Sequence, residues 1–538
     1  MHYFVLGAIA APNSLIHYVG ILFHKTPFEG LYRPNLFDLS ILIPYFSSLI
    51  ILSVYGIHRY HLTHVYLKNR HRVSKPPEGD HPLPRVTIQL PIFNERYVVE
   101  RLLESITAID YPRELLEIQA LDDSTDETRF VCSQRVADYA HQGFTISYHH
   151  RDNREGYKAG ALAEGLKKAS GDLVAIFDAD FAPPPSVLRQ MVPYFADPKV
   201  GVVQGRWTWI NRDYSSLTEV QAIMLDGHFV IEHGARYCSG RFFNFNGTAG
   251  MWRREAIEDA GGWQHDTLTE DTDLSYRAQL RGWKFIYDPS IECPSELPVE
   301  VNAFKTQQAR WAKGLIQTAK KILPLVWKSD EPFKIKLEAT LHLTANVAYP
   351  LMLIFSLILF PAMIVRFYQG WFQMLYLDLP LFLASTCSVS SFYMVAQREL
   401  YPRQWLRRTR YIPFLMATGI GLSVINAKAV IEAFFGKHSE FVRTPKYRVE
   451  GRQGHWESKK YLKKGGWIPL VELALAVYFL FTTIYALTTE NYLTAPFLVL
   501  FLVGYSYMAG MSLLQTPFRR LWHALPRPVR EPAVSVET

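Results

Sequence analysis

The stretch Leu173-Val-Ala-Ile-Phe-Asp-Ala-Asp180 decides the fold class of this chain. Its apolar residues form a short unbroken run, which is typical of a strand. The two carboxylates that follow, Asp178 and Asp180, stand one residue apart where this strand ends. Such a pair can share a hard divalent cation, Mg²⁺ or Mn²⁺, that also binds substrate phosphates. An isolated triplet of this kind also occurs in solvated turns, so its meaning depends on the sequence around it.

Two earlier apolar runs end in a similar way. Val86–Leu90 ends at Pro91 and Leu116–Leu121 ends at Asp122-Asp123, with helical spacing over Glu95–Ile106 between them. Strands separated by helices predict a mostly parallel sheet with crossover connections. In open α/β sheets, ligands bind at the edge where such strands end. We therefore expect a pocket there, in which Asp123 either hydrogen-bonds a nucleoside or only closes a turn. Asn94 and Glu95 could line the same pocket.

Two predicted helix starts bring charged residues to this region. Arg154-Glu-Gly-Tyr-Lys158 opens a helix, and a lysine at a helix N-terminus among glycines is well placed to bind a diphosphate. Thr267-Leu-Thr-Glu-Asp271 predicts a second helix start, with Thr269 as its cap. Acidic residues stabilise a first helical turn without any function. That explanation is stronger for Glu270 and Asp273 than for Asp271.

A further motif, Gln307-Gln-Ala-Arg310-Trp311, combines an amide, a planar cation and a large aromatic ring. Arginine can grip a diphosphate in a bidentate manner. Tryptophan can stack on the apolar face of a sugar, or it can belong to the aromatic belt beside a membrane helix.

The composition divides the chain between soluble and membrane-embedded parts. It has 538 residues, of which 49% are hydrophobic and 20% charged, and its formal charge is +7. The basic residues cluster beside long apolar runs, where they fix membrane orientation, so no nucleic-acid partner is expected. The four cysteines are far apart, which argues against a zinc site or a disulfide framework and suits a reducing compartment.

Five segments are apolar and long enough to span a bilayer, which needs roughly 20 residues. Residues 3–23 could span as well, lie in the interface, or pack on other helices. Basic residues follow the first of the five segments, so that end should be cytoplasmic. The segments are Leu39–Ile57, Ala339–Val365, Leu379–Gln397, Leu470–Thr489 and Tyr492–Thr516.

Residues 411–435 are also apolar, but the basic loops 398–410 and 437–464 lie on either side of them. Because both loops should be cytoplasmic, this segment is interpreted as interfacial or re-entrant rather than spanning. Residues 315–328 have an amphipathic pattern, which suits either an interfacial helix or a surface helix of the soluble domain.

Taken in order, six motifs resemble the family-2 glycosyltransferases, specifically the membrane-bound, cellulose-synthase-like branch. Similarity is greatest to glucomannan 4-beta-mannosyltransferases and to bacterial relatives of cellulose synthase. Asp152-Asn-Arg154, Glu296-Leu-Pro298 and Glu440–Lys446 strengthen the resemblance. The six motifs are Leu121-Asp-Asp-Ser-Thr-Asp126, Tyr157-Lys-Ala-Gly-Ala-Leu162, Phe177-Asp-Ala-Asp180, Phe245-Asn-Gly-Thr-Ala-Gly250, Thr269-Glu-Asp271 and Gln307-Gln-Ala-Arg-Trp311.

This resemblance implies an α/β nucleotide-sugar-binding domain of the GT-A type between N-terminal and C-terminal transmembrane helices. The implied parts are a membrane region 1–75, a cytosolic catalytic domain 80–314, an interfacial helix 315–335, a transmembrane region 336–520 and a cytosolic tail 521–538. Residues 437–464 would form a gating-like loop, with Phe441, Thr444 and Lys446 at the family's positions. The loop is altered, because Arg443 stands where the family has valine.

The resemblance also implies a role for each site residue. Asp271 would be the general base, with Glu270 beside it, and Asp178 and Asp180 would bind Mg²⁺ or Mn²⁺. Trp311, Gly247 and Thr248 would bind the acceptor. The donor would be held by Asn94, Glu95, Asp123, Lys158, Asp178, Gln307 and Arg310.

The implied activity is inverting transfer of glucose or mannose from UDP-glucose or GDP-mannose to a growing β-linked glycan, with passage of the product across the membrane. The protein would be a multi-pass protein of the plasma (inner) membrane, with a cytoplasmic catalytic domain. A non-processive enzyme that glycosylates a lipid and a non-catalytic binding or transport protein are the alternatives. The complete set of acids argues against the non-catalytic protein. The number of spans and the gating-like loop favour the polymerase over the lipid-modifying enzyme.

Overall fold

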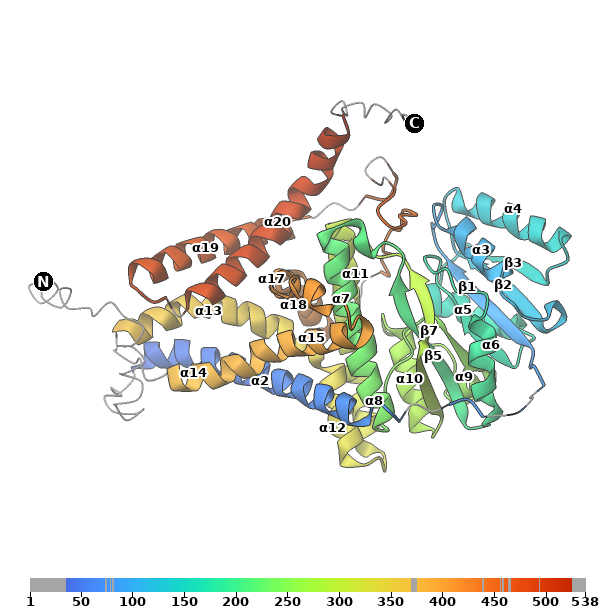
Figure 1. Ribbon diagram of the computed structural model, residues 1–538, viewed down its shortest axis with the longest axis horizontal. Coiled ribbons are helices and arrows are strands. Elements are labelled where there is room, and N and C mark those ends of the chain that lie inside the picture. The colour runs from blue at the N-terminus through green and yellow to red at the C-terminus, as the bar shows by residue number, and fades with distance from the viewer. Residues whose placement is uncertain are drawn as a thin grey trace, which may run out of the picture.

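The computed structural model describes residues 35–72, 75–77, 79, 82–368, 375–437, 440–454, 456, 459–462, 466–492 and 494–524. Figure 1 shows an α/β domain on one side of the long helix α11 (Val301–Lys328) and a group of long helices on the other. The apolar residues 3–23 and most of the tail predicted at 521–538 lie outside the described residues.

The α/β domain is built on a seven-stranded sheet with the order β3-β2-β1-β4-β6-β5-β7. The pairs β1·β2, β1·β4, β2·β3 and β5·β7 are parallel, while β6 runs antiparallel to β4 and β5. The prediction of a mostly parallel sheet is therefore confirmed. The strands are β1 (Val86–Ile92), β2 (Leu116–Asp122), β3 (Ile146–His150), β4 (Leu173–Ile176), β5 (Val200–Trp209), β6 (Gly250–Arg253) and β7 (Lys284–Ser295).

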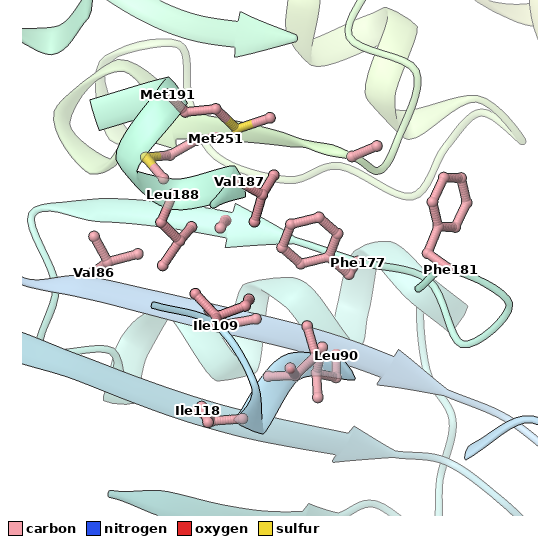
Figure 2. Packing of buried hydrophobic residues seen from close by; sticks show 14 of the residues in the cluster. Val86, Leu90, Ile109, Ile118, Phe177, Phe181, Val187, Leu188, Met191 and Met251 are labelled. Atoms are coloured by element: carbon pink, nitrogen blue, oxygen red, sulfur yellow. The ribbon is translucent and has the colours of Figure 1, made fainter. Parts of the chain in front are cut away.

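Helices cover both faces of the sheet. On one face, α3 (Val99–Thr107), α4 (Thr128–His141) and α6 (Val187–Met191) pack against the strands, and Figure 2 shows part of this core. Leu90 of β1, Phe177 directly after β4 and Met251 of β6 meet Leu188 of α6 in the same cluster. Burying each such side chain contributes about 1.5–3 kcal/mol. The other face is covered by α5 (Tyr157–Lys168), α9 (Arg254–Asp259) and α10 (Glu270–Leu280).

Within the described residues, four helices are long and apolar enough to cross a membrane. They are α2 (Leu36–Asn69), α13 (Ala348–Tyr368), α19 (Ile468–Thr488) and α20 (Ala495–Ala524). The fifth predicted span, Leu379–Gln397, is helical but is divided into α14 (Leu375–Phe382), a π-helical turn (Leu383–Cys387) and α15 (Ser388–Leu400).

The segment interpreted as interfacial or re-entrant forms two helices, α17 (Ile412–Gly421) and α18 (Ser423–Phe434), bent by 44°. The chain on both sides of this pair contacts the α/β domain. Arg408 Nη1 lies 3.0 Å from Glu219 Oε1, and Lys446 Nζ lies 2.7 Å from Asp180 Oδ2. A bent pair whose two ends return to the same domain suits a re-entrant segment.

Helix α11 joins the two halves of the molecule without a break. The predicted amphipathic segment 315–328 is its second half, and the predicted domain boundary at 314 falls inside it. Ile316 packs against Val430 of α18, while Ile322 packs against Leu343 at the end of α12 (Phe333–Leu343). Near its start, Lys305 forms a buried ion pair with Glu472 of α19, at 2.6 Å.

Candidate active site

A pocket of about 170 Å³ lies at the edge of the sheet where β1, β2 and β4 end. It brings together nearly all the residues that the sequence predicts for the site. These are Glu95, Asp123, Lys158, Asp178, Asp180, Gly247, Glu270, Asp271, Gln307, Arg310, Trp311, Phe441, Thr444 and Lys446. Asn94 and Thr248 are not among the lining residues.

The two residues outside the lining support the pocket from behind. The Asp178 backbone N–H donates to Thr248 Oγ1 at 2.9 Å, and Thr248 is fully buried. The Asn94 side chain accepts from the Thr125 N–H at 2.8 Å, and its backbone lies in the left-handed region with φ of 54°. These contacts fix the turns that carry Asp178 and Glu95.

Lysines neutralise the two carboxylates after β4. Lys158 Nζ donates to Asp178 Oδ1 at 2.5 Å and to the Gly247 carbonyl at 2.9 Å. Burial raises the pKa of Asp178 in spite of the nearby Lys158. Burial also disfavours ionised Asp180, but the charge and hydrogen bond of Lys446 together with the Ser295 hydroxyl outweigh it and lower the Asp180 pKa. Two ion pairs, Lys158–Asp178 and Lys446–Asp180, therefore lie at this edge of the sheet.

Asp271 lies at the start of α10, where its carboxylate faces Gly247. Gly247 has a φ of 79°, and a Cβ placed on it would lie 2.9 Å from Asp271 Oδ2. Burial, followed by repulsion from Glu270, raises the pKa of Asp271 to about 7. A carboxylate that titrates near neutral pH is suited to accept and release a proton.

The prediction that Thr269 caps this helix was only half right. Thr269 occupies the N-cap position of α10, but its side chain makes no capping hydrogen bond. Its hydroxyl instead lies 3.0 Å from Thr318 Oγ1 of α11. The contact between the two helices takes precedence over the local cap.

Three residues of α11 close the pocket on the side of the membrane helices. Gln307 and Trp311 line it together with Arg310, whose guanidinium lies over the Phe441 ring at 4.3 Å. Burial lowers the pKa of Arg310, and the carboxylates of Glu270 and Asp178 oppose this effect. Arg310 therefore places a half-buried positive charge between the acids and the loop.

Comparison with known proteins identifies the family to which this chain belongs. The family model described as "Glycosyltransferase like family 2" matches residues 84–314. Glucomannan 4-beta-mannosyltransferase 7 of Arabidopsis thaliana is 32% identical over 452 residues, which cover 80% of this chain and 78% of that protein. The chain belongs to glycosyltransferase family 2. The predictions of a hexosyltransferase and of a GT-A-type α/β domain are confirmed at the level of this family.

Other relatives match a shorter part of the chain. Glucomannan 4-beta-mannosyltransferase 9 of Arabidopsis thaliana is 45% identical over 241 residues, covering 44% of this chain and 45% of that protein. The chain thus spans about half the length of the first relatives it matches. Among solved structures, the chain is similar to the mannosyltransferase PcManGT from Pyrobaculum calidifontis in complex with GDP-Man and Mn2+. The TM-score is 0.46 and the identity is 21%, and the alignment covers 66% of this chain and 99% of PcManGT.

The loop 437–464, predicted to be gating-like, lies against this pocket. Phe441 stacks near Tyr157, with ring centroids 6.0 Å apart, and its carbonyl accepts from Arg154 Nη2 at 3.2 Å. Lys446 binds Asp180 and also donates to the Glu296 carbonyl. The loop thus supplies part of the pocket wall.

The donor set at Asp178 and Asp180 fits a hard divalent cation. Both carboxylates face the pocket, and oxygen ligands are what Mg²⁺ and Mn²⁺ prefer. No group of three or more His, Cys, Asp or Glu side chains within the described part of the chain is arranged to hold a metal. The two carboxylates would therefore leave ligand positions for phosphate and water oxygens.

Some pocket residues were missed by sequence reasoning. Trp207 and Trp209 line the pocket from β5, and Ser295 Oγ donates to Asp180 Oδ2 at 3.0 Å from the end of β7. Arg443 was noted only as a departure from the family pattern, yet it lies 3.0 Å from Glu95. Sequence reasoning missed both β5 and β7. The two tryptophans of Arg206-Trp-Thr-Trp209 were the signal that could have pointed to these residues.

A second, larger cavity of about 510 Å³ begins beside the same pocket and extends among the long apolar helices. Asn246, Thr269, Asp271, Gln307 and Trp311 line both spaces. Its other walls include Leu49 and Leu52 of α2, Met352 and Phe355 of α13, and Phe501 of α20. Asp271 therefore lies where a polar pocket meets a cavity between helices.

Proposed function

We propose that this family-2 glycosyltransferase transfers a hexose from a nucleotide sugar to the end of a β-linked glycan, and that the product leaves through the cavity between the membrane helices. The observation that carries the proposal is the position of Asp271, which lines both the donor pocket and that cavity. The mannosyltransferase relatives favour mannose over glucose as the transferred sugar.

Asp271 acts as the general base. The acceptor hydroxyl attacks the anomeric carbon, its proton passes to the Asp271 carboxylate, and the bond from that carbon to the nucleoside diphosphate breaks. General base catalysis contributes about 10²–10⁴-fold to the rate. One displacement inverts the anomeric centre, so an α-linked donor gives a β-linked product.

Charged side chains on the other side of the pocket hold the leaving group. Lys158 and Arg310 are half-buried cations near Asp178 and Glu270, and both are placed to stabilise the charge on the departing diphosphate. Asp178 and Asp180 would hold a Mg²⁺ or Mn²⁺ ion. When bound, such an ion supplies Lewis-acid stabilisation of phosphate charge.

Trp311 serves as the acceptor platform. It lies on α11 at the junction of the two spaces, where a glycan end would pass from the pocket into the cavity. A flat indole can stack on a sugar ring without reading each hydroxyl closely. The growing chain could therefore slide past it after each addition.

The cavity also supports a second candidate, which is glycosylation of a membrane lipid. Its deeper wall is mostly apolar, with Leu49, Leu52, Met352 and Phe355 exposed to the space. Such a wall suits an acyl or prenyl chain as well as a sugar polymer. The basic loops on both sides of the α17–α18 pair support a cytoplasmic catalytic domain under either candidate.

Purified protein incubated with a panel of nucleotide sugars tests the proposal, with the products sized by chromatography. A ladder or long polymer supports the β-glycan synthase, whereas one mono-glycosylated lipid supports the second candidate. Asp271→Asn should remove most transfer and leave donor binding nearly intact. Near-normal turnover in this variant would refute the assignment of the base.

A further inference from the structure

Arg443 is a buried cation in the donor pocket that the family pattern does not account for. Its side chain is only 10% exposed, and it stacks over the Tyr461 ring at 4.2 Å. Nη1 lies 3.0 Å from Glu95 Oε2, but neither Nη1 nor Nη2 makes a hydrogen bond with the part of the chain that the structure describes. Buried guanidinium N–H groups that lack such bonds are costly unless a ligand satisfies them.

Glu95, the partner of Arg443, is equally enclosed. Its side chain is 13% exposed, and among the described residues Oε2 meets Arg443 Nη1 as an ion pair and not as a well-aligned hydrogen bond. Burial raises the pKa of Glu95 to about 7, although Arg443 opposes that effect. The Arg443 N–H groups and the Glu95 carboxylate therefore lie side by side in the pocket, where one ligand could hydrogen-bond to both.

The order of the strands indicates which part of the donor reaches this pair. Asp178 and Asp180 follow β4, which would place the diphosphate there, and β1 and β2 lie next in the sheet. The nucleoside would then extend over the ends of β1 and β2. Phe93, Glu95 and Asp123 line the pocket at those ends, and Arg443 joins them from the loop.

The chemistry of the pair matches guanine better than uracil. Guanine presents O6 and N7, which can accept hydrogen bonds from both arms of an arginine. It also has adjacent N–H groups that can donate hydrogen bonds to a carboxylate. Uracil has a single N–H between two carbonyl groups, so a carboxylate facing it would also meet a carbonyl oxygen. A diphosphate is disfavoured at this position because Glu95 would repel it.

We propose that Arg443, together with Glu95, is a donor-binding residue that recognises the guanine base of a GDP-linked sugar. This inference rests on the proposed function, because it assigns the nucleotide of the same donor. It also gives the altered loop a role, since the residue that departs from the family pattern becomes a specificity determinant.

Equilibrium binding of GDP and of UDP to the purified full chain tests the inference without any turnover. The wild type should bind GDP more tightly. Arg443→Met should weaken GDP binding by about 10- to 100-fold, the usual value of a bidentate base contact, and leave UDP binding nearly unchanged. Arg443→Lys keeps the charge but loses the fork, so it should lose the same preference. The control is Arg448→Met on the same loop, because the Arg448 side chain is 44% exposed and 4.0 Å from Glu450.

Several results would overturn the inference. Equal weakening of GDP and UDP binding would mean that Arg443 binds the diphosphate, and wild-type GDP binding in Arg443→Lys would mean that only charge matters. Unchanged GDP binding in Arg443→Met, or a wild type that prefers UDP, would show that the pair does not read guanine. The proposed function and this inference can be refuted independently of each other. A protein that binds GDP through Arg443 but transfers no sugar refutes only the function, and one that builds glycan from a UDP-sugar refutes only the inference.

Discussion

Replacement of Gly247 by alanine should misplace the catalytic base without removing any functional group. The added Cβ would lie 2.9 Å from Asp271 Oδ2 and 3.4 Å from Lys158 Nζ, so the Asp271 carboxylate must move. The φ of 79° at Gly247 adds backbone strain, which costs a non-glycine residue about 1–2 kcal/mol. Misplacement of a reacting group by about 1 Å can reduce a rate by about 10²-fold. We expect a loss of that order in sugar transfer.

A matched glycine separates the two effects of this substitution. Gly240 has a φ of 66°, and a Cβ there would meet nothing within 4 Å. Gly240→Ala should therefore carry the strain but keep normal turnover. Initial rates of transfer, measured with saturating donor alongside nucleotide binding, give the comparison. Equal turnover in the two variants would refute the claim that Gly247 sets the position of Asp271.

Three further predictions concern pH, metal and topology. Because burial and Glu270 raise the pKa of Asp271 to about 7, the protonated form that cannot accept a proton predominates below that value. kcat/KM should therefore rise with pH and level off above neutrality, and a profile that is flat from acid to neutral pH would contradict this role. Activity should disappear in EDTA and return with Mg²⁺ or Mn²⁺, because Asp178 and Asp180 offer oxygen ligands; full activity in excess chelator would show another role for them. Single cysteines at Arg408 and Lys460 should be labelled from the same, cytoplasmic side, since the chain on both sides of α17–α18 contacts the catalytic domain; labelling from opposite sides would mean that the pair spans.

The sequence predicted three strands of the inner sheet. β1, β2 and β4 are almost entirely buried; β4 is an unbroken apolar run, whereas apolar and polar residues alternate in much of β1 and β2. β3 is a half-buried edge strand, and β6 has only four residues. Their pairing is decided by neighbours distant in the chain, which no local pattern records.

The site was predictable where each motif contributes a side chain at the end of an element. Thr248 lies behind the pocket because its hydroxyl turns inward to the Asp178 N–H, an orientation that depends on packing and not on sequence spacing. Arg443 could not be placed in the pocket from sequence, since it pairs with Glu95 across nearly the whole length of the catalytic domain and several membrane helices. Contacts of that range depend on the complete fold.

The continuity of α11 links chemistry to the passage of product. Gln307, Arg310 and Trp311 line the proposed donor pocket from the first half of this helix. The start of the helix contacts α19 and α20. Lys305 binds both Glu472 and Ser512 there, with Nζ 2.8 Å from the serine oxygen. Removing one partner of a buried ion pair commonly costs about 3–5 kcal/mol, so this clamp resists displacement of the helix. Because this helix lines both the site where a bond would form and the cavity through which the glycan would leave, we expect the glycan to move past Trp311 while the start of α11 stays in place.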